Sequence, residues 1–293
     1  MVRAEMAAYF SGDKLYGEDL SEAEREQWFK DEQEGYAELV ATYGHTYEYK
    51  YHAQNIEYGF RYLSQPEFRR VLGIGSACGY EFEPVLERCG EITILDPSEG
   101  LTNPRFRYVR PMTSGIMPFA DNSFDLVTCL NVLHHVPNVS TYLHEIGRVL
   151  DCGGTALISE PIISMGDWRN PRPGATRHER GIPLRLFHSM LKESGLAIER
   201  EHLLHFPFTG RLRYILRTAP YNTKWVVKLD RLICSLPVWS RTYYARWCWQ
   251  KLRATCVFFI VRKPARELDR PAGHGSHTVH PSVDGPRPLR GNV

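Results

Sequence analysis

Short apolar runs and amphipathic stretches alternate along the middle of the chain. Residues 70–74 and 91–95 are short, branched and mostly apolar, as buried parallel strands are. A glycine-rich turn and a predicted helix over residues 80–89 lie between them. A polar turn within residues 117–125 then leads into an apolar run that ends at Leu130. This alternation is typical of an α/β sheet with mostly parallel strands.

The next helix and strand follow from the same pattern. Asn138 is the predicted N-cap of a helix whose apolar residues recur with the 3.6-residue period. Those apolar residues are Val139, Tyr142, Leu143, Ile146, Val149 and Leu150. We expect Gly153 and Gly154 to end this helix, and residues 155–159 to form another buried strand.

The glycine-rich turn between the first two strands is the main candidate for ligand binding. Gly73, Gly75 and Gly79 have the spacing G-x-G-x-x-x-G, one residue longer than the dinucleotide fingerprint. A longer loop suits a nucleoside cofactor without a pyrophosphate. Asp96 ends the second strand, and its carboxylate can accept hydrogen bonds from a ribose diol. The alternative is an ordinary tight turn beside a surface aspartate.

Four segments in order make the chain resemble the class I S-adenosylmethionine-dependent methyltransferases of the type 11 group. They are VLGIGSACG (71–79), ILD (94–96), MPFADNSFDLVTCLNVLHHV (117–136) and EIGRVLDCGGTALISEP (145–161). The resemblance spans roughly residues 68–205. It implies a Rossmann-like α/β fold in three layers, α/β/α, with a seven-stranded, mostly parallel sheet. Residues 196–204 would be strand six, and residues 255–261 the antiparallel last strand between strands five and six.

The resemblance implies S-adenosyl-L-methionine as cofactor, and a set of residues that hold it. The set is Gly73, Gly75, Ser76, Gly79, Asp96, Pro97, Ser98, Thr113, Asn131 and Val132. Asp96 would bind the ribose hydroxyls, and Asn131 and Val132 would lie under the sulfonium. Thr113 stands where many members have an aspartate that meets the adenine amine. Adenine recognition must therefore rely on backbone groups or another side chain.

Methyl transfer from an activated sulfonium mainly requires alignment of the acceptor, but an oxygen acceptor also loses a proton. The candidate catalytic residues are His135, His178 and Glu160. His135 follows the fourth strand, and histidine is suited to act as a base at neutral pH. His178 is the rival base, and Glu160 could orient an acceptor hydroxyl or a histidine. The alternative is that His134 packs under the cofactor and His135 caps the following helix.

Two segments are candidates for the acceptor side. The loop 161–183 holds Trp168 and four arginines, which suit an anionic or sugar-like acceptor. The first expectation is therefore O-methylation of a small anionic, glycan or secondary-metabolite acceptor. The alternative for this loop is that its arginines cap helices or pair with nearby acids.

The second segment, residues 211–253, interleaves basic residues with tryptophan and tyrosine. It fits peripheral contact with an anionic membrane, where a lipid or quinone-type acceptor would be methylated. It could equally pair with the acidic N-terminal helix. A non-catalytic S-adenosylmethionine-binding protein is a further alternative, because Thr113 departs from the family pattern.

Charge and composition also suggest how the chain is organised. Residues 18–38 are acidic and are expected to form a helix with a Ser21–Glu24 capping box. The expected parts are an N-terminal helical lid (1–65), a methyltransferase domain (66–264) with a basic aromatic insertion (207–253), and a disordered tail (265–293). The histidines of that tail are expected to be solvated rather than bound to metal.

Composition excludes several classes of partner. The formal net charge is +2, and no recognised nucleic-acid motif is present. The seven cysteines contain no C-x-x-C pair, which is typical of a reducing compartment. No signal-peptide core is evident, and no apolar run approaches the roughly 18 residues of a spanning helix. We therefore expect a cytoplasmic protein with a small-molecule acceptor, and peripheral membrane contact only through residues 211–253.

Overall fold

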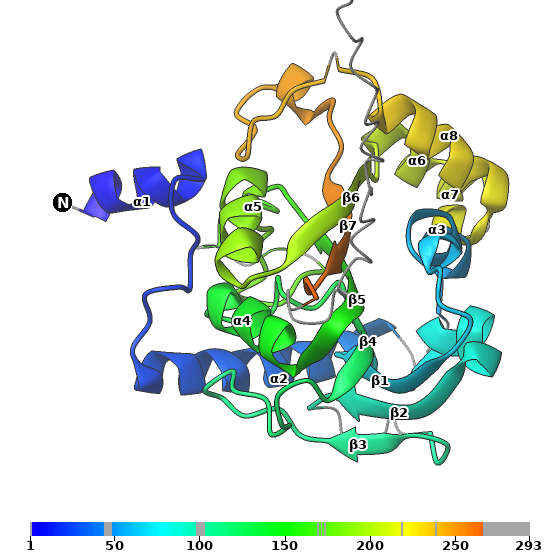
Figure 1. Ribbon diagram of the computed structural model, residues 1–293. Helices are drawn as coiled ribbons and strands as arrows, with labels where there is room; N and C mark the ends of the chain where they lie inside the picture. Colours follow the sequence, from blue (N-terminus) through cyan, green and yellow to red (C-terminus); the bar gives the residue numbers. More distant parts are fainter. Residues whose placement is uncertain are drawn as a thin grey trace, which may run out of the picture.

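A seven-stranded sheet forms the centre of the protein in a computed structural model (Figure 1). The structure describes residues 2–43, 49–97, 103–168, 170, 172, 174–217, 219–237 and 239–265. The strands are β1 (Phe68–Ile74), β2 (Cys89–Leu95), β3 (Arg107–Val109), β4 (Phe124–Leu130), β5 (Leu150–Pro161), β6 (Ala197–Leu204) and β7 (Cys256–Arg262). Their order is β3-β2-β1-β4-β5-β7-β6. β7 is antiparallel to both β5 and β6, which confirms the predicted place of the last strand.

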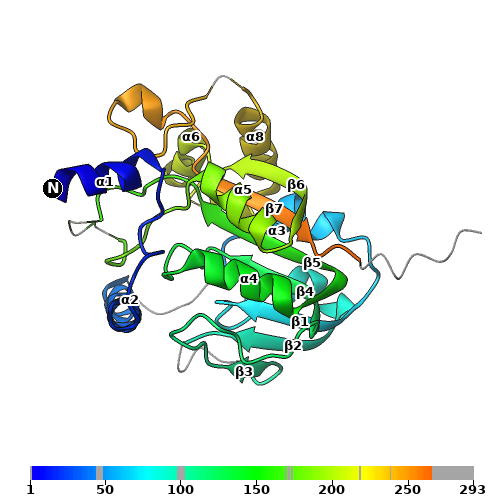
Figure 2. The ribbon, with the colours of Figure 1, turned by 60° about the vertical axis from the view of Figure 1, so that its left-hand side comes forward.

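Helices cover both faces of this sheet, so the three-layer prediction is confirmed (Figure 2). On one face, α4 (Val139–Val149) and α5 (Leu184–Glu193) bury Ile146 and Phe187 in one apolar core. On the other face lie α3 (His52–Tyr58), η1 (Phe60–Tyr62), η2 (Tyr80–Arg88) and α8 (Lys224–Cys234). Tyr58, Phe82 and Val227 from these elements join a second core. Burial of these side chains is the main force that holds the layers together.

The remaining elements lie at the ends of the chain and beside the sheet. They are α1 (Val2–Ser11), α2 (Glu22–Tyr43), α6 (Pro207–Arg211), α7 (Arg213–Leu216), η3 (Pro220–Asn222) and η4 (Cys248–Lys251). The predicted capping box at the start of α2 is confirmed. The Ser21 amide donates to Glu24 Oε2 at 2.8 Å, and the Glu24 amide donates to Ser21 Oγ at 3.4 Å. Helix α1 lies within the expected N-terminal helical segment (1–65), where only the helix of residues 18–38 was predicted individually.

Two local predictions were wrong, and a third is confirmed in part. The helix after the glycine turn, η2, is a 3₁₀-helix and contains Pro84, which cannot donate a backbone hydrogen bond. Asn138 is the N-cap residue of α4, as predicted, but its backbone is left-handed and its side chain makes no capping bond. Its backbone amide donates to the Gly17 carbonyl at 3.1 Å. Helix α4 ends at Val149, and β5 begins at once, so Gly153 and Gly154 lie inside the strand rather than at the helix end.

Several sequence expectations concern residues that are not all described. The proposed tail begins at residue 265, and residues 266–293 lie outside the described part, as do Ser98 and the rest of 98–102 between β2 and β3. All seven cysteines are described and carry free thiols. Within the described ranges, no helix is long and apolar enough to cross a membrane. The same residues contain no cluster of three metal-ligating side chains.

Candidate active site

The glycine-rich turn after β1 is fastened to the end of β2. Gly75, Ala77 and Gly79 all have positive φ angles, of 64°, 44° and 69°. Alternate left-handed residues turn backbone amides inward and form a concavity for an anion. The Ala77 amide donates to Asp96 Oδ2 at 2.8 Å, and the Gly75 amide donates to the Leu95 carbonyl at 2.9 Å. The turn and the carboxylate predicted to bind ribose therefore form one unit.

The residue that completes this turn is Ala77, not Gly73 as the sequence interpretation had it. Gly73 lies within β1, and the space beside its Cα is filled by Ser76 and Phe82. It therefore permits close packing rather than the approach of a ligand. Ala77 was missed because a left-handed backbone is rare for a residue with a Cβ. Glycine is needed at position 75 because a methyl group there would lie 2.5 Å from the Val132 side chain.

Glu81 stabilises the turn by hydrogen bonds, and this role was not predicted from the sequence. Its carboxylate accepts hydrogen bonds from Ser76 Oγ at 2.8 Å and from Thr128 Oγ1 at 2.7 Å. The side chain is buried, and this burial raises the pKa of Glu81 to about 7. Glu81 thus links the turn to the neighbouring strand β4. No sequence signal separates it from the exposed acids of the same segment.

The loop after β4 is organised by Glu160, which is fully buried. One oxygen of Glu160 accepts from the amides of Val132 and Leu133, each at 2.7 Å. The other lies 2.8 Å from Nδ1 of His134. Glu160 therefore orients a histidine and the loop, and orienting a histidine is one of its two expected roles. Asn131, at the start of the loop, has φ 60° and donates its amide to the Ser159 carbonyl.

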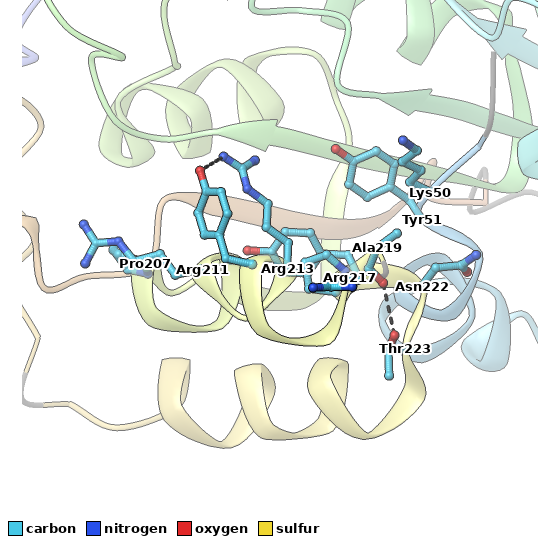
Figure 3. Close-up of a pocket in the computed structure, with 13 residues that line it drawn as sticks. Lys50, Tyr51, Pro207, Arg211, Arg213, Arg217, Ala219, Asn222 and Thr223 are labelled. Carbon is cyan, nitrogen blue, oxygen red and sulfur yellow. Dashed lines mark hydrogen bonds between the residues drawn. The ribbon is translucent and has the colours of Figure 1, made fainter. Parts of the chain in front are cut away.

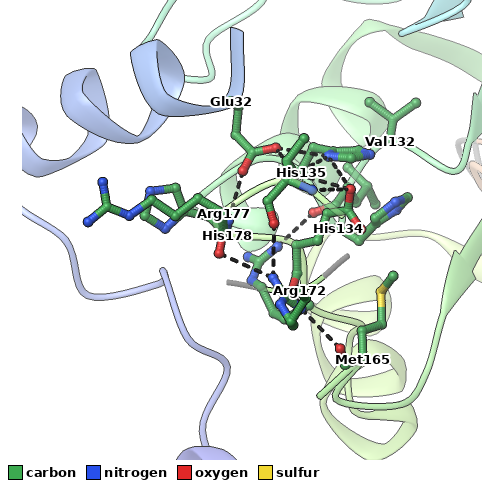
Figure 4. Close-up of polar contacts among 12 residues, drawn as sticks. Glu32, Val132, His134, His135, Met165, Arg172, Arg177 and His178 are labelled. Atoms are coloured by element: carbon green, nitrogen blue, oxygen red, sulfur yellow. Dashed lines mark hydrogen bonds and ion pairs between the residues drawn. The ribbon is translucent and has the colours of Figure 1, made fainter. Parts of the chain in front are cut away.

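Each of the two adjacent histidines binds a carboxylate, His134 that of Glu160 and His135 that of Glu32 (Figure 4). His135 Nδ1 lies 2.9 Å from Glu32 Oε2, which α2 supplies. Burial alone would raise the pKa of Glu32, but hydrogen bonds from His135 and Thr176 outweigh it and lower the pKa. Burial, together with the nearby His135, lowers the pKa of His134. His134 is therefore the packed histidine, whereas the side chain of His135 is 29% exposed.

His178 also binds α2, but its environment is that of a packed residue. Its Nε2 lies 2.7 Å from Asp31 Oδ2, and its ring stacks on Trp28 with centroids 4.3 Å apart. Its amide donates to Glu32 Oε1 at 2.9 Å. The Trp28 indole donates to the His135 carbonyl at 2.6 Å. These bonds hold α2 against both the loop after β4 and the loop after β5.

Two arginines of the loop after β5 have structural roles, whereas Arg177 is exposed and pairs with Asp31 at 3.3 Å. Arg180 is fully buried and donates to the carbonyls of Tyr16, Leu133 and Val136. Arg172 donates to four carbonyls of its own loop. Trp168 is buried and stacks on Phe10 and Tyr16, so it offers no flat face to an acceptor. Arg169 lies outside the described residues. The sequence did not reveal these roles, because the partners of Arg180 lie far away in the chain and those of Arg172 depend on how the loop folds.

A pocket of about 360 Å³ lies between α2 and the loops that follow β2 and β3. Its lining residues are Glu26, Phe29, Lys30, Gln33, Pro97, Arg110, Pro111 and Thr113. Pro97 directly follows Asp96, so the pocket is placed to take the base of a nucleoside whose ribose is bound at Asp96. Thr113 lines it as expected, and Glu26 supplies a carboxylate that the sequence pattern lacks at position 113. These residues fit the adenosine half of S-adenosylmethionine.

The chain is similar to known methyltransferases over this region. Residues 72–158 match the sequence profile of a family described as "Methyltransferase domain". An uncharacterized methyltransferase of Mycobacterium sp. (strain JLS) is 28% identical over 191 residues, which cover 63% of this chain and 69% of that protein. The uncharacterized methyltransferase YcgJ of Bacillus subtilis (strain 168) is 30% identical over 102 residues, which cover 30% of this chain and only 39% of the relative.

A solved structure extends the comparison to the fold. The [4+2]-cyclase SpnF matches with a TM-score of 0.50 at 15% identity, covering 80% of this chain and 97% of that one. Because that protein is named a cyclase, the fold alone does not determine the reaction. The sequence similarity supplies what the fold does not: residues 72–158 form a methyltransferase domain of the class I S-adenosylmethionine-dependent type 11 group.

Proposed function

We propose that the protein transfers a methyl group from S-adenosylmethionine to the oxygen of a small acceptor, with His135 as general base. The observation that carries this proposal is the contact between His135, in the loop after β4, and Glu32 of α2. If Nδ1–H donates to Glu32, the lone pair of Nε2 is directed away from the carboxylate and can accept a proton. A hydroxyl acceptor loses a proton on methylation and therefore benefits from a histidine oriented by a carboxylate. A thioether or a tertiary amine carries no such proton and needs no base.

The cofactor supplies an electrophilic methyl group. As the acceptor oxygen forms its bond to that methyl carbon, the sulfur–carbon bond breaks and the hydroxyl proton passes to His135. The products are a methyl ether or ester and S-adenosylhomocysteine. Helix α2 acts as the lid of this site, because it supplies Glu32 to the base and Glu26 and Phe29 to the nucleoside pocket. Closure of such a lid keeps water from the reacting groups.

The test begins with purified protein, methyl-labelled S-adenosylmethionine and a small-molecule extract, and identifies the labelled product by mass spectrometry. With that acceptor, His135→Ala should lower kcat by about a hundredfold or more, as loss of a general base does. Binding of S-adenosylhomocysteine, measured by calorimetry, should be retained. His178→Ala is the matched control, because this histidine also binds an acid of α2. Near-normal turnover of His135→Ala would rule out the base, and cofactor binding without any transfer would favour a non-catalytic binding protein.

A lipid or quinone-type acceptor at a membrane surface is the second candidate, supported by exposed aromatic side chains in residues 211–253. Trp225, Trp247 and Trp249 are 53%, 64% and 65% exposed. Among the described residues, no ion pair joins this segment to the acids of α2, so the pairing suggested as its alternative role is not found. Basic residues beside exposed tryptophans favour an anionic membrane surface. Flotation with anionic vesicles at low salt should recover the protein, and its absence from the vesicle fraction would exclude this candidate.

A further inference from the structure

A second and larger pocket, of about 1050 Å³, lies apart from the nucleoside pocket (Figure 3). Helices α6 and α7 and the 3₁₀-helix η3 form most of it, and Lys50 and Tyr51, which precede α3, close one side. None of the family motifs in the sequence contributes a residue to it. The pocket is therefore a feature of this chain's own segment between β6 and β7.

Three arginines give the pocket its charge. Arg211, Arg213 and Arg217 line it and are exposed. In the described part of the chain, no carboxylate lies within ion-pair distance of any of the three, although Arg213 donates to the neighbouring Tyr214 hydroxyl at 2.6 Å. Arg231, in the adjacent helix, shows the contrast, since it pairs with Glu57 at 2.5 Å. Unpaired guanidinium groups around one hollow create a positive potential that attracts an anion.

Asp230, an acid near Tyr221 of the pocket, is occupied by other partners. Asp230 is buried in α8, and its carboxylate accepts from the amides of His205 and Phe206, each at 2.8 Å, and from the Thr209 hydroxyl. It holds the start of α6 in place instead of facing the pocket arginines. The positive charge of the pocket is thus left to be matched by a ligand.

One wall of the pocket is aromatic. The Tyr221 ring stacks on His205 with centroids 3.9 Å apart, and lies nearly parallel to the Tyr51 ring, at 6.3 Å and 13°. His205 is fixed by Gln54 and Cys256, and burial lowers its pKa to about 3, so the wall is uncharged at neutral pH. Flat rings beside arginines favour a ligand that combines an anionic group with an apolar or aromatic body.

Two links connect this pocket to the edge of the sheet where the cofactor is expected. His52, which follows Tyr51, binds the Tyr80 carbonyl at 2.7 Å, directly after Gly79 of the glycine turn. Cys256, in contact with His205, pairs across the sheet with Pro161, next to Glu160. Contacts therefore link the wall of the pocket to the edge of the sheet where the candidate active site lies.

We propose that this pocket binds a phosphate group of the methyl acceptor, held by Arg211, Arg213 and Arg217, with the rest of the acceptor against Tyr221. The identification of this ligand as the acceptor rests on the proposed function, whereas its binding does not. Several arginine forks match the oxygens of a phosphate better than the two oxygens of a carboxylate. The phosphate can belong to a soluble ester or to a phospholipid, because Phe208 and Ile215 on the same helices are 55% and 76% exposed.

The test compares two triple variants of the full chain with the same loss of charge. R211Q/R213Q/R217Q removes the pocket arginines, and R69Q/R107Q/K192Q removes three exposed basic residues that lie outside both the pocket and the segment 211–253. Calorimetry measures binding of phenyl phosphate, and flotation measures binding to phosphatidylcholine vesicles with and without phosphatidic acid. Circular dichroism confirms that both variants are folded.

We expect the pocket variant to bind phenyl phosphate at least about tenfold more weakly, because charge-assisted hydrogen bonds are lost. The control variant should stay within about twofold of the parent. Binding only to phosphatidic acid vesicles, lost in the pocket variant and kept in the control, would support the proposal and identify the source as a lipid. Equal behaviour of the two variants, or no binding of either probe to the parent, would overturn it.

Binding of S-adenosylhomocysteine to the same samples separates this proposal from the proposed function. If S-adenosylhomocysteine binds but neither phosphate probe does, the pocket proposal alone fails. If the phosphate probes bind in the pocket-dependent way but S-adenosylhomocysteine does not, the proposed methyl transfer fails and the phosphate site stands.

Discussion

The substitution Glu81→Gln tests what the negative charge of the buried carboxyl beside the glycine turn costs the folded protein. Burial raises the pKa of Glu81 from 4.5 to about 7, and the hydrogen bonds from Thr128 and Ser76 offset only part of that rise. Between these two values the folded protein holds a proton that the unfolded chain has lost, so stability falls as pH rises. The difference between the two pKa values is worth about 3 kcal/mol. The glutamine amide oxygen can still accept both hydrogen bonds, but it carries no charge.

The free energy of unfolding of both proteins should be measured by urea denaturation at a series of pH values. Relative to the parent, Glu81→Gln should gain about 3 kcal/mol between pH about 4.5 and about 8, with the gain complete above the folded pKa. Glu87→Gln, at an exposed position of the same 3₁₀-helix, controls for the removal of an acid from this segment. If the difference between Glu81→Gln and the parent does not vary with pH, Glu81 is not the uncompensated buried carboxyl that its environment implies.

Three further substitutions test the site and its support. Asp96→Asn should weaken binding of S-adenosylhomocysteine by about tenfold to a hundredfold in calorimetry, because hydrogen bonds to a carboxylate are the stronger ones; unchanged affinity would refute its role at the ribose. Arg180→Met should lower the free energy of unfolding by about 3 kcal/mol or more, since three buried carbonyls lose their donor; a loss below about 1 kcal/mol would mean that water replaces the guanidinium. Gly79→Ala should cost about 1–3 kcal/mol more than Gly153→Ala. Both glycines have positive φ, but a methyl group on Gly79 would meet Phe106 at 2.5 Å, whereas nothing lies within 4 Å of one on Gly153; equal losses of thermal stability would contradict the packing argument.

Local pattern alone was enough to predict much of this fold. The pattern placed two strands within two residues of β1 and β2, because apolar runs and turn residues report directly on backbone conformation. Strand β6 is mostly exposed, and only the family resemblance placed it. The pattern identified Asp96 at the end of β2 and the capping box of α2, since both depend on residues that are close in the sequence. It failed at η2 and at Ala77, where surrounding packing overrides the preference of the local segment.

Roles that depend on distant partners were decided only by the tertiary structure. The sequence supplied His135, Glu160 and a run of arginines as candidates, but their partners could not be read from it. Glu32 lies 103 residues before His135, and Tyr16 lies 164 residues before Arg180. Such contacts fix whether a charged group is buried, paired or left for a ligand. That is why Arg180 proved to be structural, while the sequence by itself had determined the order of the strands along the chain and the motifs of the cofactor site.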